Sequence, residues 1–191
     1  MPYMINRQAA LVVILLSTIL LSGCSSLFGE SPGEQADAAI EEANAAIEEH
    51  NRSFGEARDT YASVKSEIEA GNDPSAQQDR ITEARGAMEQ ARSSLQEATA
   101  SLGEVNDLDV DSQVKRYANT LSDAMEAQIS AEDREIEFYT LLQEDPALEN
   151  NRQEALDLLE QVGNDYEEAE QAYAQARQLA DENPDLIEAT S

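Results

Sequence analysis

Residues 31–71 read SPGEQADAAIEEANAAIEEHNRSFGEARDTYASVKSEIEAG, and this stretch decides the fold. One set of positions within it, the seam, recurs at alternating steps of four and three residues and is apolar except at His50. This spacing is the heptad pattern of helices that pack side by side. Every second seam position is small for most of the length, which lets a partner helix approach closely. The seam consists of Ala36, Ile40, Ala43, Ile47, His50, Phe54, Ala57, Tyr61, Val64 and Ile68.

Both ends of this stretch carry signals for helix boundaries. Ser31 precedes Pro32, and Glu34 completes the pattern of a capping box, in which serine and glutamate side chains satisfy free backbone N–H groups. Gly71 can supply the left-handed residue that ends a helix. We expect a helix over about residues 32–70.

The chain restarts at Asp73-Pro74, an N-cap followed by a favourable first helical residue. A second helix is expected over about residues 74–102. The connection is short, so the first two helices should form an antiparallel hairpin. The second seam again alternates large residues with alanine: Ile81, Ala84, Met88, Ala91, Leu95, Ala98 and Leu102.

Two more helices are expected over about residues 112–144 and 147–182. Gln128, Glu132 and Glu135 dilute the middle of the third helix, which makes its seam less regular. Asp145-Pro146 marks the next break, with Asp145 expected as the N-cap of the fourth helix. The fourth seam consists of Ala155, Leu159, Val162, Tyr166, Ala169, Tyr173, Ala176 and Ala180.

The composition fits an all-α protein, with abundant alanine, glutamate and glutamine and no sustained period-two alternation. We predict an antiparallel four-helix bundle with heptad, alanine-rich seams over residues 34–182, followed by a tail at 183–191. Two hairpins packed end to end are the alternative arrangement.

The start of the chain has the features of a cleaved signal peptide. Residues 9–21 are almost uninterrupted apolar side chains after Arg7, and about 20 Å of helix is too short for a lasting membrane span. The run ends at Leu21-Ser22-Gly23-Cys24, which resembles the lipobox of prokaryotic lipoproteins. An ordinary secretory signal with a chance cysteine is the alternative.

The lipoprotein resemblance implies cleavage after Gly23, lipid attachment to Cys24 and usually acylation of the new amino terminus with a fatty acid such as palmitate. The signal peptide would be residues 1–23, and residues 24–33 would be a flexible lipidated tether. Two or three acyl chains anchor a protein stably. The resemblance further implies the cell membrane or the outer membrane, with the body in the periplasm or outside the cell.

Charge limits the partners of the mature chain. Cleavage would remove Arg7 and no acidic residue, leaving 11 basic and 40 acidic groups and a net charge of −29. Nucleic acid is thereby excluded as a partner. The same charge repels anionic headgroups, so the body should stand off the bilayer.

No residue pattern indicates catalysis, a metal or a cofactor. His50 lacks the Glu-x-x-His pairing of di-iron bundles, and we expect it to be a neutral core residue with a hydrogen-bond partner. Asp107-Leu108-Asp109-Val110-Asp111 opens like a calcium loop, but Ser112 replaces the required glycine, which favours an acidic loop with an N-cap.

Two functions remain open. The first is a membrane-anchored cell-surface lipoprotein with a structural or protein-interaction role in the cell envelope, where another envelope protein is the expected partner. The second is a lipoprotein binding module for a small apolar or cationic ligand. Tyr61, Tyr166 and Tyr173 could line its pocket, although seam tyrosines usually pack with the hydroxyl turned outward.

Overall fold

The computed structural model describes residues 30–183, which form four long helices joined by short connections. The predicted all-α helical bundle is confirmed. The helices are α1 (Pro32–Glu69), α2 (Gln78–Glu104), α3 (Ser112–Glu144) and α4 (Arg152–Glu182), with two 3₁₀ turns at Pro74–Gln77 and Val105–Asp107. The expected signal peptide (1–23), Cys24 and nearly all of the tail lie outside the described residues. No helix within residues 30–183 is apolar over a length that could cross a bilayer.

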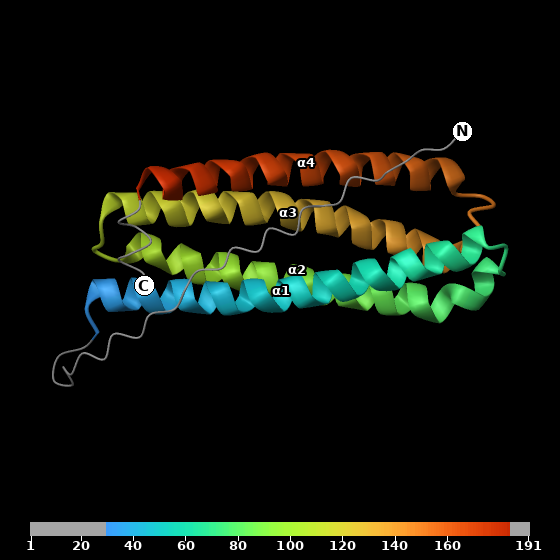
Figure 1. Ribbon diagram of the computed structural model, residues 1–191, viewed down its shortest axis with the longest axis horizontal. Helices are drawn as coiled ribbons and strands as arrows, with labels where there is room; N and C mark the ends of the chain where they lie inside the picture. The colour runs from blue at the N-terminus through green and yellow to red at the C-terminus, as the bar shows by residue number, and fades with distance from the viewer. Residues whose placement is uncertain (1–29, 184–191) are drawn as a thin grey trace.

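Successive helices run in opposite directions, as the colours of Figure 1 show. Hydrogen bonds between α1 and α2 follow the same order, because Ser101 reaches Glu42 near one end and Arg80 reaches Ser63 near the other. The start of α1 and the end of α4 therefore lie at one end of the bundle. The α1–α2 turn and the α3–α4 loop lie at the opposite end, which we call the far end.

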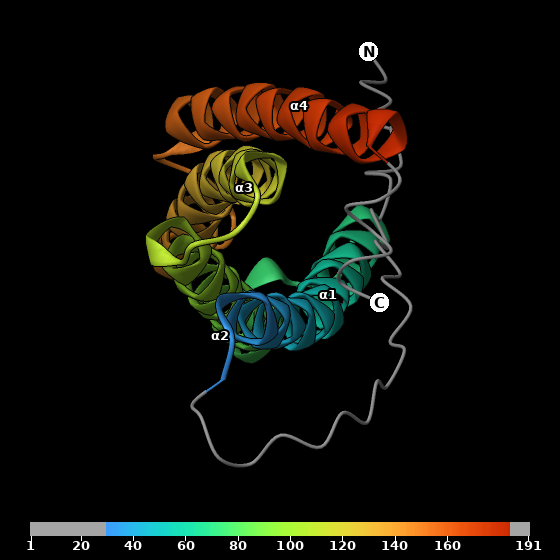
Figure 2. The same cartoon turned by 90° about the vertical axis from the view of Figure 1, so that its left-hand side faces the viewer.

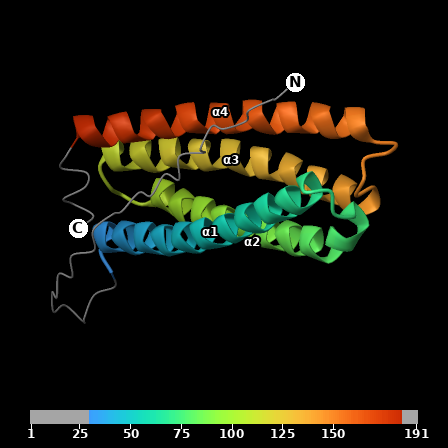
Figure 3. The same ribbon diagram turned by 45° about the vertical axis from the view of Figure 1, so that its right-hand side comes forward.

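Each helix packs against its neighbours in the sequence. The close backbone contacts join α1 with α2, α2 with α3, and α3 with α4. The view along the bundle shows the ribbons of α1 and α4 standing apart (Figure 2), and Figure 3 shows the same separation. Long side chains bridge this space, since the Phe54 and Tyr166 rings lie 6.0 Å apart.

The boundary signals of the first two helices act as expected. Ser31 and Glu34 form the capping box of α1, and Gly71 adopts a φ of 90° in the following turn. Asp73 accepts a hydrogen bond from the N–H of Ser75, but the structure it caps is the short 3₁₀ turn that leads into α2.

The expected role of Asp145 is wrong. Asp145 ends α3 instead of starting α4, and its carboxylate accepts hydrogen bonds from the backbone N–H groups of residues 149–151. Leu148 turns the loop through a left-handed conformation with φ of 51° and packs its side chain against the core. The helix begins only at Arg152, later than the expected position near residue 147.

The apolar core consists of two clusters along the bundle. One lies toward the end where α1 begins, and the other lies toward the far end. The first includes Ile40, Ile47, Leu95, Leu102, Leu121, Met125 and Tyr173, and the second includes Val64, Ile81, Met88, Phe138, Tyr139 and Leu142. Buried polar side chains occupy the middle of the bundle, between the two clusters.

Candidate functional site

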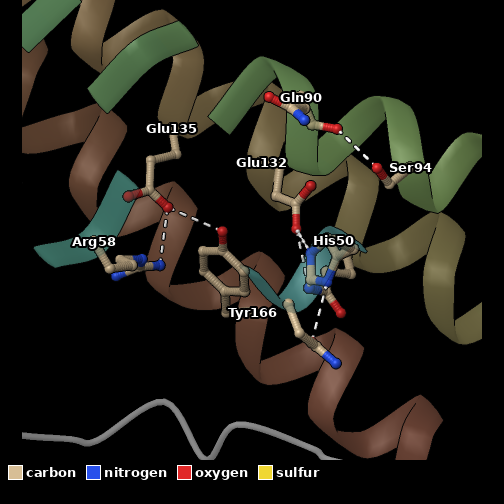
Figure 4. Close-up of polar contacts among 9 residues, drawn as sticks. His50, Arg58, Gln90, Ser94, Glu132, Glu135 and Tyr166 are labelled. Atoms are coloured by element: carbon tan, nitrogen blue, oxygen red, sulfur yellow. Dashed lines mark hydrogen bonds and ion pairs between the residues drawn. The ribbon is translucent and has the colours of Figure 1, made fainter. Parts of the chain in front are cut away.

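A group of polar side chains from three helices fills the middle of the bundle, and we call it the buried polar layer. Figure 4 shows most of its members. Its two charged acids are almost fully enclosed, since Glu132 is 0% exposed and Glu135 is 4% exposed. The layer consists of His50 and Arg58 from α1, Gln128, Glu132, Glu135 and Tyr139 from α3, and Tyr166 from α4.

His50 lies against a carboxylate across the bundle. Its Nε2 atom is 2.8 Å from Glu132 Oε1, and Gln128 donates to the same carboxylate oxygen at 2.9 Å. The other ring nitrogen, Nδ1, lies 3.2 Å from Asn51 Oδ1. The expected core histidine with a hydrogen-bond partner is therefore present.

Glu135 joins three helices through one carboxylate. It accepts a hydrogen bond from Tyr139 at 2.7 Å, from Tyr166 at 2.9 Å and from the Arg58 guanidinium at 2.8 Å. The Arg58 guanidinium also makes cation–π contacts with two rings, lying 4.9 Å from the Phe54 ring centre and 5.0 Å from that of Tyr166. Through Arg58 and Tyr166, the Glu135 carboxylate links the separated helices α1 and α4.

Burial changes the acidity of the groups around Glu135. Desolvation raises the pKa of Tyr139 and Tyr166 well above the ordinary value, and the Glu135 carboxylate raises both further. Desolvation by itself would lower the pKa of Arg58, but the Glu135 carboxylate and Tyr166 outweigh it and raise that pKa. The network therefore favours neutral tyrosines and a charged arginine.

Two buried polar atoms of the layer lack a partner among residues 30–183: Glu132 Oε2 and Arg58 Nε. Within the same residues, no three acidic, histidine or cysteine side chains are placed to hold a metal ion. The hydrogen bonds and ion pairs of the layer connect α1 with α3 and α3 with α4.

The spacing of residues in the third helix indicates this layer, although we expected these residues only to make the seam less regular. Gln128, Glu132 and Glu135 continue the four-and-three spacing between Met125 and Tyr139. They occupy seam positions, as His50 does in α1, so their burial follows from the heptad pattern. Arg58 lies beside the seam, and nothing in the spacing identifies it.

The other residues that the sequence singled out have separate positions. Asp111 caps α3 by accepting from the N–H of Gln113 at 2.7 Å, as expected for an acidic loop with an N-cap. Leu108 and Val110 pack against the first core cluster. The prediction that seam tyrosine hydroxyls turn outward is wrong for Tyr166, whose hydroxyl points inward to Glu135. The expected lipid attachment site, Cys24, lies outside the described residues.

A groove with a volume of about 740 Å³ lies on the outside of the far end, between α3 and α4, and we call it the far-end groove. Its floor is apolar and formed by Ile136, Leu141 and Leu158, which pack against or belong to the second core cluster. Its rim is acidic and exposed to water: Glu137 and Glu144 come from α3, and Glu154 and Asp157 come from α4.

The rim carboxylates have almost no partners in the described part of the chain. Glu137, Glu144 and Glu154 make no side-chain hydrogen bond or ion pair with residues 30–183, and Asp157 accepts only from the Gln153 amide. No lysine or arginine is among the residues that line the groove. The groove thus combines an apolar floor with uncompensated negative charge on both walls.

No family model matches the chain, and neither a curated protein nor a solved structure is significantly similar to it.

Proposed function

We propose that the protein is a membrane-anchored lipoprotein of the cell envelope, whose helical bundle has a structural or protein-interaction role. The sequence Leu21-Ser22-Gly23-Cys24 supports the anchor. In the described structure α1 begins at Pro32, so only a short segment separates the expected lipid from the rigid bundle.

The observation that carries the interaction role is the position of the far-end groove. The start of α1 lies at one end of the bundle and the groove at the other. A helix as long as α1, with 38 residues, extends about 57 Å at 1.5 Å per residue. If the bundle is attached at Cys24 and repelled by the lipid surface, the groove is held tens of ångströms from the membrane, where it can meet another envelope component.

A binding module for a small cationic or apolar ligand is the second candidate. The acidic rim favours it, because paired carboxylates raise the local concentration of cations. The groove is, however, an open surface feature, whereas small-molecule sites enclose most of the ligand surface. We therefore favour a protein partner.

The anchor is tested by Cys24→Ala. The expected result is a shift of the protein from the membrane fraction to the soluble fraction and loss of radiolabelled palmitate incorporation. Ser25→Ala is the matched control and should leave both unchanged. Sedimentation of the Cys24→Ala protein with membranes after a high-salt wash would refute the lipid anchor.

A further inference from the structure

We infer that the far-end groove is a docking site for a short basic amphipathic helix of a partner protein. The inference rests on the proposed interaction role and names the chemistry of the partner. Three features of the groove carry it: an apolar floor, an acidic rim on both walls, and a length that fits a few helical turns.

The floor selects for aliphatic side chains. Leu141 is buried, whereas Ile136 and Leu158 are half-buried, so these two side chains present apolar surface that a partner can remove from water. An amphipathic helix supplies such side chains at spacings of three and four residues along one face. Burial of this apolar surface would provide affinity without any change in the bundle.

The rim selects for basic side chains on either side of that apolar stripe. Glu137 and Glu144 lie along one wall, with Glu154 and Asp157 along the other, and the lining contains no cation to neutralise them. Lysine or arginine residues flanking the apolar face of a helix would reach both walls. The basic side chains of a bound helix would offset the repulsion between the rim carboxylates.

The dimensions of the groove set the length of the occupant. The lining residues of α3 run from Ile136 to Glu144, about 12 Å along the helix axis, and those of α4 cover a similar length. A helix of two to three turns fills that length.

The chain itself does not provide this occupant. A second copy carries the same net charge of −28 and is repelled. Residues 184–191 contain Asp185 and Glu188 and no basic residue, so the carboxyl-terminal segment is also a poor match for an acidic rim. Charge complementarity therefore indicates a separate, basic partner.

The test measures binding of a fluorescent peptide by anisotropy. The full chain is purified in neutral detergent, and the probe is an amphipathic helix of about 10 leucine and lysine residues with the leucines on one face. This measurement does not depend on the lipid at Cys24, so its failure is distinct from a failure of the membrane anchor. A peptide with serine in place of leucine tests the apolar floor.

Two quadruple variants separate the groove from general attraction to an acidic protein. The groove variant is Glu137→Gln, Glu144→Gln, Glu154→Gln and Asp157→Asn. The control removes the same charge elsewhere through Glu56→Gln, Glu83→Gln, Glu97→Gln and Glu126→Gln, all exposed. All eight positions are on the surface, so both variants should keep the far-ultraviolet circular dichroism spectrum and the melting behaviour of a folded bundle.

We expect the groove variant to weaken binding of the leucine–lysine peptide about tenfold and the control variant less than about threefold. Several results would overturn the inference: equal weakening by both variants, equal binding of the serine–lysine peptide, or no measurable binding. Displacement of the leucine–lysine peptide by spermidine at a concentration similar to that of the peptide that half-saturates the groove would instead identify a site for small cations. That result too would overturn the inference.

Discussion

Glu135→Gln tests whether the Glu135 carboxylate links the separated helices α1 and α4. The substitution keeps the shape of the side chain, removes the charge that pairs with Arg58, and turns an amide N–H₂ group toward a site where three donors converge. One of those donors loses its acceptor. We expect the free energy of unfolding to fall.

The magnitude follows from the exposure of the two partners. Breaking a fully buried ion pair costs about 3–5 kcal/mol, whereas an exposed pair contributes about 0.2–1 kcal/mol. The Glu135 side chain is 5% exposed but the Arg58 side chain is 37% exposed, so water still reaches the guanidinium. We expect an intermediate loss of about 2 kcal/mol.

Urea unfolding followed by circular dichroism measures this loss. Glu126→Gln is the matched control, since Glu126 is exposed on the same helix, and it should change the free energy of unfolding by less than about 0.5 kcal/mol. A double-mutant cycle with Arg58→Met should give a coupling of about 1–2 kcal/mol. A loss no larger than that of the control, or strict additivity in the cycle, would refute the role assigned to Glu135.

Three further predictions concern pH, the α3–α4 loop and salt. Desolvation raises the pKa of Tyr61 to about 12 and also raises the pKa of Tyr173. Above about pH 10 the unfolded chain releases these protons while the native chain keeps them, so the urea midpoint should fall between about pH 9 and pH 12. A constant midpoint would contradict this. Asp145→Ala should lower the melting temperature more than Asp59→Ala. Hydrogen bonds from backbone N–H groups lower the pKa of Asp145, so the stability that Asp145 gives the native protein is present above about pH 4 and is lost as the pH falls through the native pKa. A pH-independent difference from Asp59→Ala would count against a role of Asp145 in capping the loop. Raising ionic strength from about 0.1 M to 1 M shortens the Debye length from about 10 Å to 3 Å and should raise the melting temperature of this acidic protein; a flat or falling melting temperature would show that carboxylate repulsion does not limit stability.

Helix positions could be predicted from the sequence because they depend on local features. The seams and the capping box at Ser31 and Glu34 involve residues a few positions apart, and their geometry is fixed by the helix itself. The second seam is buried at every position from Ile81 to Leu102 for the same reason.

The two Asp-Pro pairs show where local reasoning fails. Asp73-Pro74 is followed at once by a 3₁₀ turn, whereas after Asp145-Pro146 the chain makes a loop before α4 begins. The difference depends on Leu148, whose side chain packs into the second core cluster and holds the backbone in a left-handed conformation. Such a contact is tertiary, and the dipeptide does not encode it.

The candidate groove could not be predicted either. Its walls come from two helices, and the acidic residues that line it are few among the 40 in the chain. Which of them face one another depends on how α3 and α4 pack, and that packing is tertiary.

The buried polar layer has a consequence for how the helices slide along one another. Heptad seams are nearly self-similar, so α1 moved by seven residues against α3 would still place apolar residues opposite apolar residues over most of its length. That movement would bring His50 beside Met125 or Tyr139 in place of Glu132, and the bond between the histidine and the Glu132 carboxylate would be lost. A buried polar group left unpaired costs about 1–3 kcal/mol, and more if it is charged. The layer thus favours one register of α1 against α3 over registers shifted by a heptad.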